Sequence, residues 1–244
     1  MKTNQFRFYA TLLDSFLWYE QSESEFAEQE FLNRINRVEE TDAEKIWNMG
    51  RGTALNNLVD KGIVESGTIL EGTIRENVGL NMYEFEADVV NELCSKLYGS
   101  ASQIYTEMKL NVSGADVLLY GYIDYLRDKC VDLKTTKEYI LGKYKNSMQL
   151  HLYPLSLSND GVFVDEFEFL VVEFSSRGTN IFSETYKCDL VESKAILTET
   201  CERLIHFIES KRDLITDTKI FGIEPNTFVA THDNETNATM IEKI

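Results

Sequence analysis

The chain has 244 residues and a formal net charge of −17, which comes from 24 Lys and Arg residues against 41 Asp and Glu residues. A chain of this length can bury a core of its own, and its 43% hydrophobic and 27% charged residues exclude a disordered or collagen-like protein. The negative charge repels polyphosphates at long range, which excludes a protein that coats DNA without specificity. A local basic site within an acidic shell stays compatible with this charge.

Membrane, secreted and zinc-dependent classes are also disfavoured. No stretch approaches the roughly 18 consecutive apolar residues of a bilayer-spanning helix, and no apolar signal region follows residues 1–8. We therefore expect a cytoplasmic protein without membrane association. No Cys-x-x-Cys pair occurs, which argues against zinc or iron-sulfur sites and predicts buried free thiols at all four cysteines, namely Cys94, Cys130, Cys188 and Cys201.

The first predicted elements are helices. Apolar residues recur at three- and four-residue spacing in segments 9–19, 25–38 and 43–61, and again in 84–97. Segment 20–44 carries nine acids and two arginines, which a solvated helix face explains. Two prolines, no linker and no internal repeat predict a single domain over residues 1–244. Within it we expect a helical part over 1–100, a core over about 101–190, and a final helix and tail over 190–244.

Strands are predicted in the middle of the chain. Segments 104–110, 116–126 and 130–134 have strand composition and short polar connections, which indicates an antiparallel meander. Helical spacing returns over 138–152, two more strands are expected over 162–174 and 181–187, and a long helix over 190–214. The order of elements predicts an α/β fold with a central mixed β-sheet flanked by helices.

The meander carries the residues with the clearest chemistry. If 130–134 is a strand, Asp132 and Lys134 share one face about 6 to 7 Å apart, and a hairpin brings Asp124 to the same end of the sheet. Two converging carboxylates repel unless a cation lies between them. Mg²⁺ is the natural cation, since it binds one or two carboxylates together with substrate phosphate oxygens. With a lysine to orient water, the implied chemistry is phosphodiester hydrolysis.

The predicted helix that follows supports this site. At 100° per residue Lys145, Gln149 and Tyr153 form a stripe beside the apolar one. Segment 127–145 has six basic and three acidic residues, a local reversal of the overall charge. Gln149 and Tyr153 have a second interpretation, in which they satisfy buried polar groups. His151 is expected to be structural, and His206 and His232 have no partner pattern.

The motifs Gly121-x-x-Asp124, Asp132-x-Lys134-Thr135 and Gln149-x-x-x-Tyr153, in this order, resemble the PD-(D/E)XK nuclease superfamily, in its RecB-like and phage exonuclease-like branch. The resemblance covers residues 46–153 and implies a restriction-endonuclease-like core. It implies that Asp124 and Asp132 bind metal with the Leu133 carbonyl, and that Lys134 is catalytic. It further implies substrate contacts by Gln149 and Tyr153, and we add Thr135 and Lys145 to them. Glu107 is a candidate for the additional acidic ligand, with an exposed strand residue as the equal alternative.

One upstream segment departs from the family pattern. Gly52, Asn56 and Asp60 stand where a Gly-x-x-x-His-x-x-x-Glu helix is usual, and we assign Asn56 a substrate contact. An amide oxygen suits hard cations only weakly, so the change is compatible with a preference for Mg²⁺, slower catalysis or a weakened second metal site. The cysteines that hold an iron-sulfur cluster in some RecB-like nucleases have no counterpart.

The resemblance implies a Mg²⁺- or Mn²⁺-dependent deoxyribonuclease, exonuclease-like, that acts in DNA recombination, repair or phage replication. Its partner would be DNA with linear or single-stranded ends, together with a recombination or replication protein, in the host cytoplasm if a phage encodes it. The sequence is compatible with endonuclease action, with RNA and with any oligomeric state. A second hypothesis, kept open by Asn56 and the acidity of 20–44, is a weak or inactive nuclease-fold protein that binds a protein partner.

Overall fold

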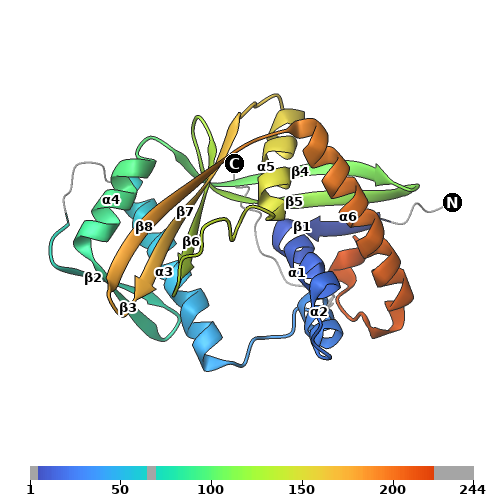
Figure 1. The fold of residues 1–244 in the computed structure, drawn as a ribbon, viewed down its shortest axis with the longest axis horizontal. Helices are drawn as coiled ribbons and strands as arrows, with labels where there is room; N and C mark the ends of the chain where they lie inside the picture. Colours follow the sequence, from blue (N-terminus) through green and yellow to red (C-terminus); the bar gives the residue numbers. More distant parts are fainter. Residues whose placement is uncertain (1–4, 65–69, 223–244) are drawn as a thin grey trace, which may run out of the picture.

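The computed structural model describes residues 5–64 and 70–222. Its centre is a mixed sheet in the order β1-β5-β6-β7-β8, with β4 paired to the other edge of β5 (Figure 1). The strands of this sheet are β1 (Gln5–Tyr9), β4 (Ala101–Val112), β5 (Ala115–Leu126), β6 (Cys130–Thr136), β7 (Glu166–Ser175) and β8 (Gly178–Lys187). A separate hairpin contains β2 (Thr73–Val78) and β3 (Asn81–Glu86).

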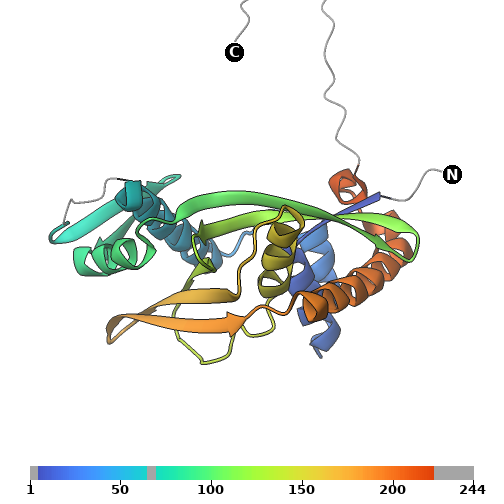
Figure 2. The ribbon, with the colours of Figure 1, turned by 90° about the horizontal axis from the view of Figure 1, so that it is seen from above.

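Helices pack on both faces of the sheet (Figure 2). They are α1 (Ala10–Gln21), α2 (Ala27–Ile35), α3 (Ala43–Val64), α4 (Ala87–Leu97), α5 (Met148–Asn159) and α6 (Leu190–Ser210), followed by short 3-10 turns η1 (Arg212–Leu214) and η2 (Thr218–Phe221). None of the helices in the described ranges is long and apolar enough to cross a membrane. The predicted mixed sheet with flanking helices is confirmed.

Two hydrophobic clusters hold the layers together, because successive side chains of a strand point to opposite faces. In β7, Phe167 and Phe169 belong to the cluster formed with α1, α5 and α6. Leu170 and Val172 belong to the cluster formed with α3 and α4. Val131 of β6 also faces α3 and α4, so the opposite face of β6 looks toward α5. This arrangement decides where the polar residues of β6 lie.

The predicted meander is confirmed, since β5 pairs antiparallel with both β4 and β6. The helix expected over 138–152 is wrong in its position, because residues 137–147 form turns and α5 begins at Met148. Carboxylates from two strands bind the backbone of this segment: Glu173 accepts the Tyr139 N–H at 2.9 Å and Glu184 accepts the Gly142 N–H at 3.1 Å. Gly142 also has a left-handed φ of 78°. These contacts come from strands far along the chain.

Three strands lie outside the sequence predictions. β1 pairs parallel with β5 just before α1, and the β2-β3 hairpin precedes α4. The helix predicted over 84–97 therefore begins only at Ala87, because the first residues of that segment belong to β3. Gly79 stands in the hairpin turn with a φ of 61°, which a glycine adopts without strain.

Candidate metal centre

The candidate site lies where β5 changes its partner strand. Along one edge, β5 pairs first with β1, up to Tyr9 opposite Tyr120, and then with β6, from Tyr125 opposite Val131. Neither β1 nor β6 pairs with the stretch of β5 between these two positions. Asp124 lies in this interval, one residue before the ladder with β6 begins.

The hairpin brings Asp124 and Asp132 together, as the sequence predicts. The ladder between β5 and β6 ends at Tyr125 opposite Val131, and Asp124 and Asp132 are the next residues of the two strands beyond this pair. Directly opposed residues of an antiparallel pair have Cβ atoms about 5 Å apart, and like charges there repel. Asp124 Oδ2 accepts the Leu133 N–H at 3.0 Å, which holds the carboxylate against β6.

The electrostatics of Asp124 reflect this crowding. Burial and, after it, the Asp132 charge raise the pKa of its carboxyl from the usual 3.8 to about 7, against the lowering effects of the Leu133 N–H and Lys134. A cation placed between the two carboxylates would remove the repulsion and favour the charged form.

Asp132, Lys134 and Gln149 form a closed ring of polar contacts on the face of β6 that looks toward α5. Lys134 Nζ lies 2.6 Å from Asp132 Oδ2 and donates to Gln149 Oε1 at 2.7 Å. Gln149 Nε2 donates to Asp132 Oδ1. Burial lowers the pKa of Lys134, but the Asp132 and Asp124 charges outweigh it, so the net pKa is raised and the ammonium stays charged.

The donor set fits a hard divalent cation. Asp132 is 2% exposed, and its Oδ2 receives no hydrogen bond of ordinary geometry from the described residues, although Lys134 Nζ is close enough for an ion pair. In an extended strand the N–H and C=O of one residue point to the same edge, so the Leu133 carbonyl faces Asp124 as its N–H does. Two carboxylates and one carbonyl leave room for water and phosphate oxygens, as Mg²⁺ requires.

This set is small. In the described ranges no group of three or more His, Cys, Asp or Glu residues is close enough to hold a metal ion. The geometry therefore offers a centre with two carboxylates, and it gives no support to a third acidic ligand.

Glu107 is a correction to the predicted ligand set. Its position on β4 pairs with Tyr120, which lies four residues from Asp124 on β5, or about 13 Å along the strand. Alternation along β4 puts Glu107 on the exposed face, where its carboxylate accepts the Tyr105 hydroxyl at 2.5 Å. The alternative interpretation, an exposed strand residue, describes this position.

Gln149 and Tyr153 are placed at the site, but both are buried, with exposures of 5% each. This burial favours the interpretation in which they position other groups rather than touch substrate. The Tyr153 ring fills the space that Gly121 leaves open, since a Cβ at Gly121 would lie 2.6 Å from Tyr153 Cε1. The glycine of the Gly-x-x-Asp motif thus admits the tyrosine of α5 beneath β5.

The other predicted contacts are distributed around this centre. Lys145 is exposed in the turn segment, not on the helical stripe expected for it, because α5 begins three residues later. Thr135 faces α3, where its Oγ1 lies 3.2 Å from the position of a Cβ at Gly52. Asn56 Oδ1 accepts the Tyr125 hydroxyl at 3.4 Å. Neither Asn56 nor Thr135 joins the ring of Asp132, Lys134 and Gln149.

The predicted bystanders also have clear places. His151 is half-buried, with Nδ1 3.1 Å from Ser193 Oγ, and burial lowers its pKa, which agrees with a structural role. His206 is exposed on α6, and His232 lies outside the described residues. All four cysteines are free thiols, of which Cys130 and Cys201 are buried.

Asp14 belongs to the site although sequence reasoning did not find it. Its Oδ1 accepts the Met148 N–H at 2.6 Å and its Oδ2 accepts the Ser147 hydroxyl at 3.0 Å, so it caps the start of α5. Burial raises the pKa of Asp14, and the Lys134 and Asp132 charges also act on it. The sequence signal for Asp14 was its spacing of four residues from the buried Ala10, because this spacing puts both side chains on the same face of α1.

We expect Asp14→Ala to lower the free energy of unfolding by about 1 to 2 kcal/mol, because it removes a helix cap and leaves a backbone N–H of α5 unpaired. Urea unfolding followed by circular dichroism measures the change. Asp14→Asn retains an acceptor oxygen and is the matched control, expected to lose less than half as much. Equal stability of Asp14→Ala and the wild type would contradict the capping role.

The raised pKa of Asp124 predicts an unusual pH dependence of the metal-free protein. Between about pH 4 and pH 7 the folded state binds more protons at this carboxyl than the unfolded state, so its contribution to stability falls as pH rises through this window. Relative to Asp124→Asn, the wild type should lose stability from pH 5 to pH 8 in a chelator. Denaturant unfolding of the wild type and of Asp124→Asn at pH 5 and pH 8 measures this loss. An equal change in the free energy of unfolding of the two proteins between these pH values would contradict the prediction.

No protein-family model matches the chain, and no curated protein sequence matches it. Among solved structures it is similar to SSO0001, with a TM-score of 0.45 and 14% identity over 82% of this chain and 76% of that chain. It is also similar to a protein from Eubacterium rectale that bears the name "Putative exonuclease", with a TM-score of 0.43 and 13% identity over 96% of this chain and 90% of that chain. At such low TM-scores, neither likeness identifies the family or the activity of the chain.

Proposed function

We propose that the protein is a metal-dependent nuclease that hydrolyses phosphodiester bonds of DNA. The observation that carries the proposal is the approach of Asp124 to β6, where its Oδ2 accepts the Leu133 N–H at 3.0 Å beside Asp132, with Lys134 Nζ 2.6 Å from Asp132 Oδ2. Adjacent buried carboxylates destabilise a fold unless they have a compensating role, and a site for a cation supplies one. The three motifs that resemble the PD-(D/E)XK superfamily meet at this point.

Mg²⁺ or Mn²⁺ is the proposed cofactor, held by Asp124, Asp132 and the Leu133 carbonyl. When bound, such an ion supplies Lewis acidity toward a phosphoryl oxygen and lowers the pKa of coordinated water. The proposal includes no iron-sulfur cluster. It extends to a restriction-endonuclease-like core of the RecB-like and phage exonuclease-like branch, and the packing of Gly52 against Thr135 of β6 and the Asn56 contact with Tyr125 support it, because they bring this helix close to the strands of the site.

The roles of the side chains follow from their contacts. The Lys134 ammonium, kept charged by its neighbours, would orient water and offset the negative charge that develops on the phosphoryl oxygens. Gln149 would fix the positions of the Lys134 and Asp132 side chains relative to each other, since it contacts both. Asp14 and Tyr153 are positioning residues, because they fix the start of α5 and its approach to β5.

We infer linear DNA or single-stranded ends as the substrate, and an exonuclease-like role in recombination, repair or phage replication within the cytoplasm. The net charge of −17 disfavours lasting contact with DNA outside the basic segment 127–145. A recombination or replication protein remains the proposed partner.

The test is degradation of linear DNA by the wild type and by Asp132→Asn. We expect the wild type to degrade DNA with Mg²⁺ or Mn²⁺, to be inactive with a chelator, and to lose activity in the variant. Asp132→Asn keeps the size of the side chain and an oxygen acceptor for Gln149, so a loss would report on the charge. Activity that resists the chelator would refute a metal-dependent nuclease. Inactivity of the wild type on every polynucleotide would favour the protein-binding alternative.

A further inference from the structure

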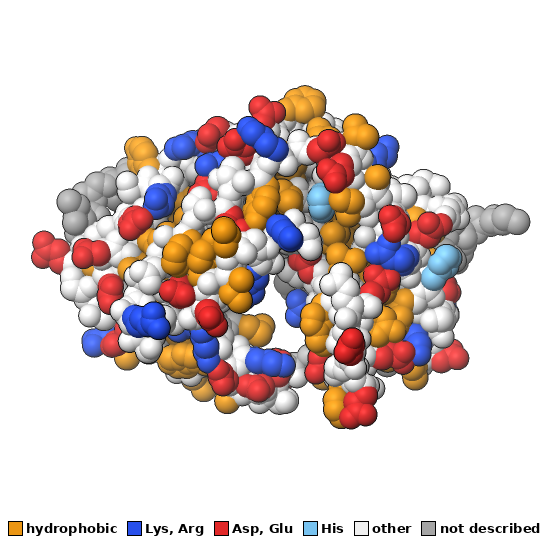
Figure 3. Space-filling model, viewed as in Figure 1, with side chains coloured by type: hydrophobic (Ala, Val, Ile, Leu, Met, Phe, Trp, Pro, Cys, Tyr) orange, Lys and Arg blue, Asp and Glu red, His pale blue; other side chains and the backbone are white. Residues whose placement is uncertain are grey.

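A pocket of about 440 Å³ opens beside the candidate metal centre, between α3 and the pair α1 and α2. Figure 3 shows a hollow in this part of the molecule, with Lys and Arg side chains at its rim. A volume of this size lies in the range of about 300 to 1,000 Å³ that is typical of sites for one small ligand. The residues that line it are Asp14, Ser15, Trp18, Glu30, Phe31, Arg34 and Lys45.

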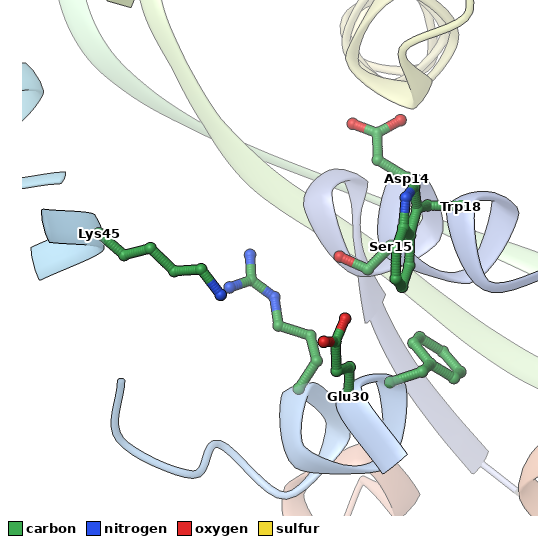
Figure 4. Close-up of a pocket in the computed structure, with 7 residues that line it drawn as sticks. Asp14, Ser15, Trp18, Glu30 and Lys45 are labelled. Carbon is green, nitrogen blue, oxygen red and sulfur yellow. The ribbon is translucent and has the colours of Figure 1, made fainter. Parts of the chain in front are cut away.

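Asp14 connects this pocket to the metal centre. It lines the pocket, and its carboxylate turns toward the start of α5 (Figure 4), where it accepts the Ser147 hydroxyl and the Met148 N–H. The next residue along α5 is Gln149, which contacts both Lys134 and Asp132. Asp14 therefore links the lining of the pocket to the helix that carries Gln149.

The lining has an aromatic wall and two cations. Trp18 of α1 is 49% exposed, so part of its indole is accessible from the pocket that it lines. Lys45 reaches toward the pocket from α3 (Figure 4), with Glu40 as a distant ion partner at 3.6 Å, and Arg34 is exposed on α2. Since Asp14 is engaged by α5, Glu30 is the other acid that lines the pocket beside these two cations.

This combination has the chemistry of a site for single-stranded nucleic acid. Such sites pair basic side chains with the backbone and stack bases on aromatic rings, and stacking is available only to bases that are unpaired. Duplex DNA presents phosphates but no free base face. A pocket with an exposed indole next to two cations therefore favours a single strand over a duplex.

We propose that this pocket binds the nucleotide next to the scissile phosphate of a single-stranded DNA, with its base stacked on Trp18 and its phosphate paired with Lys45 and Arg34. The inference rests on the proposed nuclease function and adds the part of the substrate that the metal centre does not recognise. It assigns specificity for unpaired DNA to α1, α2 and α3 rather than to the sheet.

The chain has two tryptophans, which gives the experiment a matched control. Trp47 is 43% exposed, similar to Trp18, but it packs on Tyr83 with ring centroids 4.5 Å apart and lines a separate pocket. Trp47→Phe leaves Trp18 as the single tryptophan, and Trp18→Phe leaves Trp47. Each protein is titrated with oligothymidine in a chelator, so that binding is measured without cleavage.

We expect oligothymidine to quench fluorescence in Trp47→Phe and to leave Trp18→Phe unchanged. Trp18→Ala should weaken binding about tenfold, as loss of one stacked base does. Lys45→Ala and Arg34→Ala should each lower the slope of log affinity against log salt by about 0.7, the value for one contact with a single-strand phosphate. Glu30→Gln should strengthen binding, because it removes the opposing charge.

Three outcomes would overturn the inference. They are no quenching of Trp18, equal quenching by a blunt duplex of the same length, and equal quenching of Trp47. Circular dichroism of each variant confirms that the comparison is between folded proteins. Cleavage of linear DNA with Mg²⁺ is measured in parallel on the wild type. Cleavage by the wild type without quenching of Trp18 would reject this pocket as the binding site and leave the nuclease proposal intact. Quenching of Trp18 without cleavage would instead reject the nuclease proposal and retain the pocket as a binding site for single-stranded DNA.

Discussion

Lys134→Gln is expected to lower the rate of metal-dependent DNA degradation by about 10² to 10³-fold, the usual loss when one group that stabilises transition-state charge is removed. Lys134 is the cation that contacts both Asp132 and Gln149, so its ammonium is fixed close to the proposed metal ligands. Glutamine retains a donor toward Asp132 and avoids an unpaired buried carboxylate, whose cost would be several kcal/mol. Single-turnover degradation of linear DNA measures the effect.

Metal affinity separates this role from a structural one. We expect Lys134→Gln to bind Mn²⁺ at least as tightly as the wild type, because it removes a positive charge beside the site, whereas Asp132→Asn should bind it much less tightly. Calorimetric titration with Mn²⁺ compares the two. Lys109→Gln changes an exposed lysine of β4 and is the matched control, with no expected effect on either measurement. Wild-type rates in Lys134→Gln would remove this residue from the mechanism.

Gly121→Val should lower the free energy of unfolding by about 3 kcal/mol or more, which is the upper part of the usual cost of overpacking. A Cβ at this position would lie 2.6 Å from Tyr153 Cε1 and 2.9 Å from the Tyr153 hydroxyl, and the Tyr153 ring is held in a buried environment. Because α5 carries Gln149 as well, displacement of Tyr153 should also disturb the ring around Asp132. Urea unfolding and DNA degradation measure the two consequences.

A second substitution tests whether the close approach is the cause. Tyr153→Leu shortens the side chain, so Gly121→Val should cost much less in that background than in the wild type. A double-mutant cycle gives the coupling energy, which lies at about 0.5 to 3 kcal/mol for residues in contact. Full additivity of the two substitutions would show that Gly121 serves the backbone of β5 rather than the ring of α5.

The centre of the site was predictable because its determinants are local. Alternation along β6 separates Asp132 and Lys134 from Val131, and a short connection makes β5 and β6 a hairpin that brings Asp124 close to Asp132. Gln149 was also predicted at the site, although the helix that carries it starts ten residues later than its periodicity indicates. Residue spacing within a few turns or strands was enough for these features.

The remaining features depend on contacts between distant segments. Turn formation over 137–147 depends on Glu173 and Glu184 of β7 and β8, and no periodicity within the segment reports those carboxylates. Asp14 reaches Met148 across 134 residues of sequence. Glu107 has a suitable residue type, but the register of β4 against β5 carries it away from Asp124. Tertiary packing thus decides the outer part of the site.

The change of partner along β5 has a mechanical consequence. The half of the sheet that contains β1 and the half that contains β6, β7 and β8 are joined through β5 and through β4, which pairs along the whole of β5, and Asp124 lies at the seam between the two halves. Any rotation of one half about this seam alters the spacing of Asp124 from Asp132. Substitutions remote from both carboxylates, in α1 or under β8, would therefore change the affinity for the metal ion that we propose at this seam.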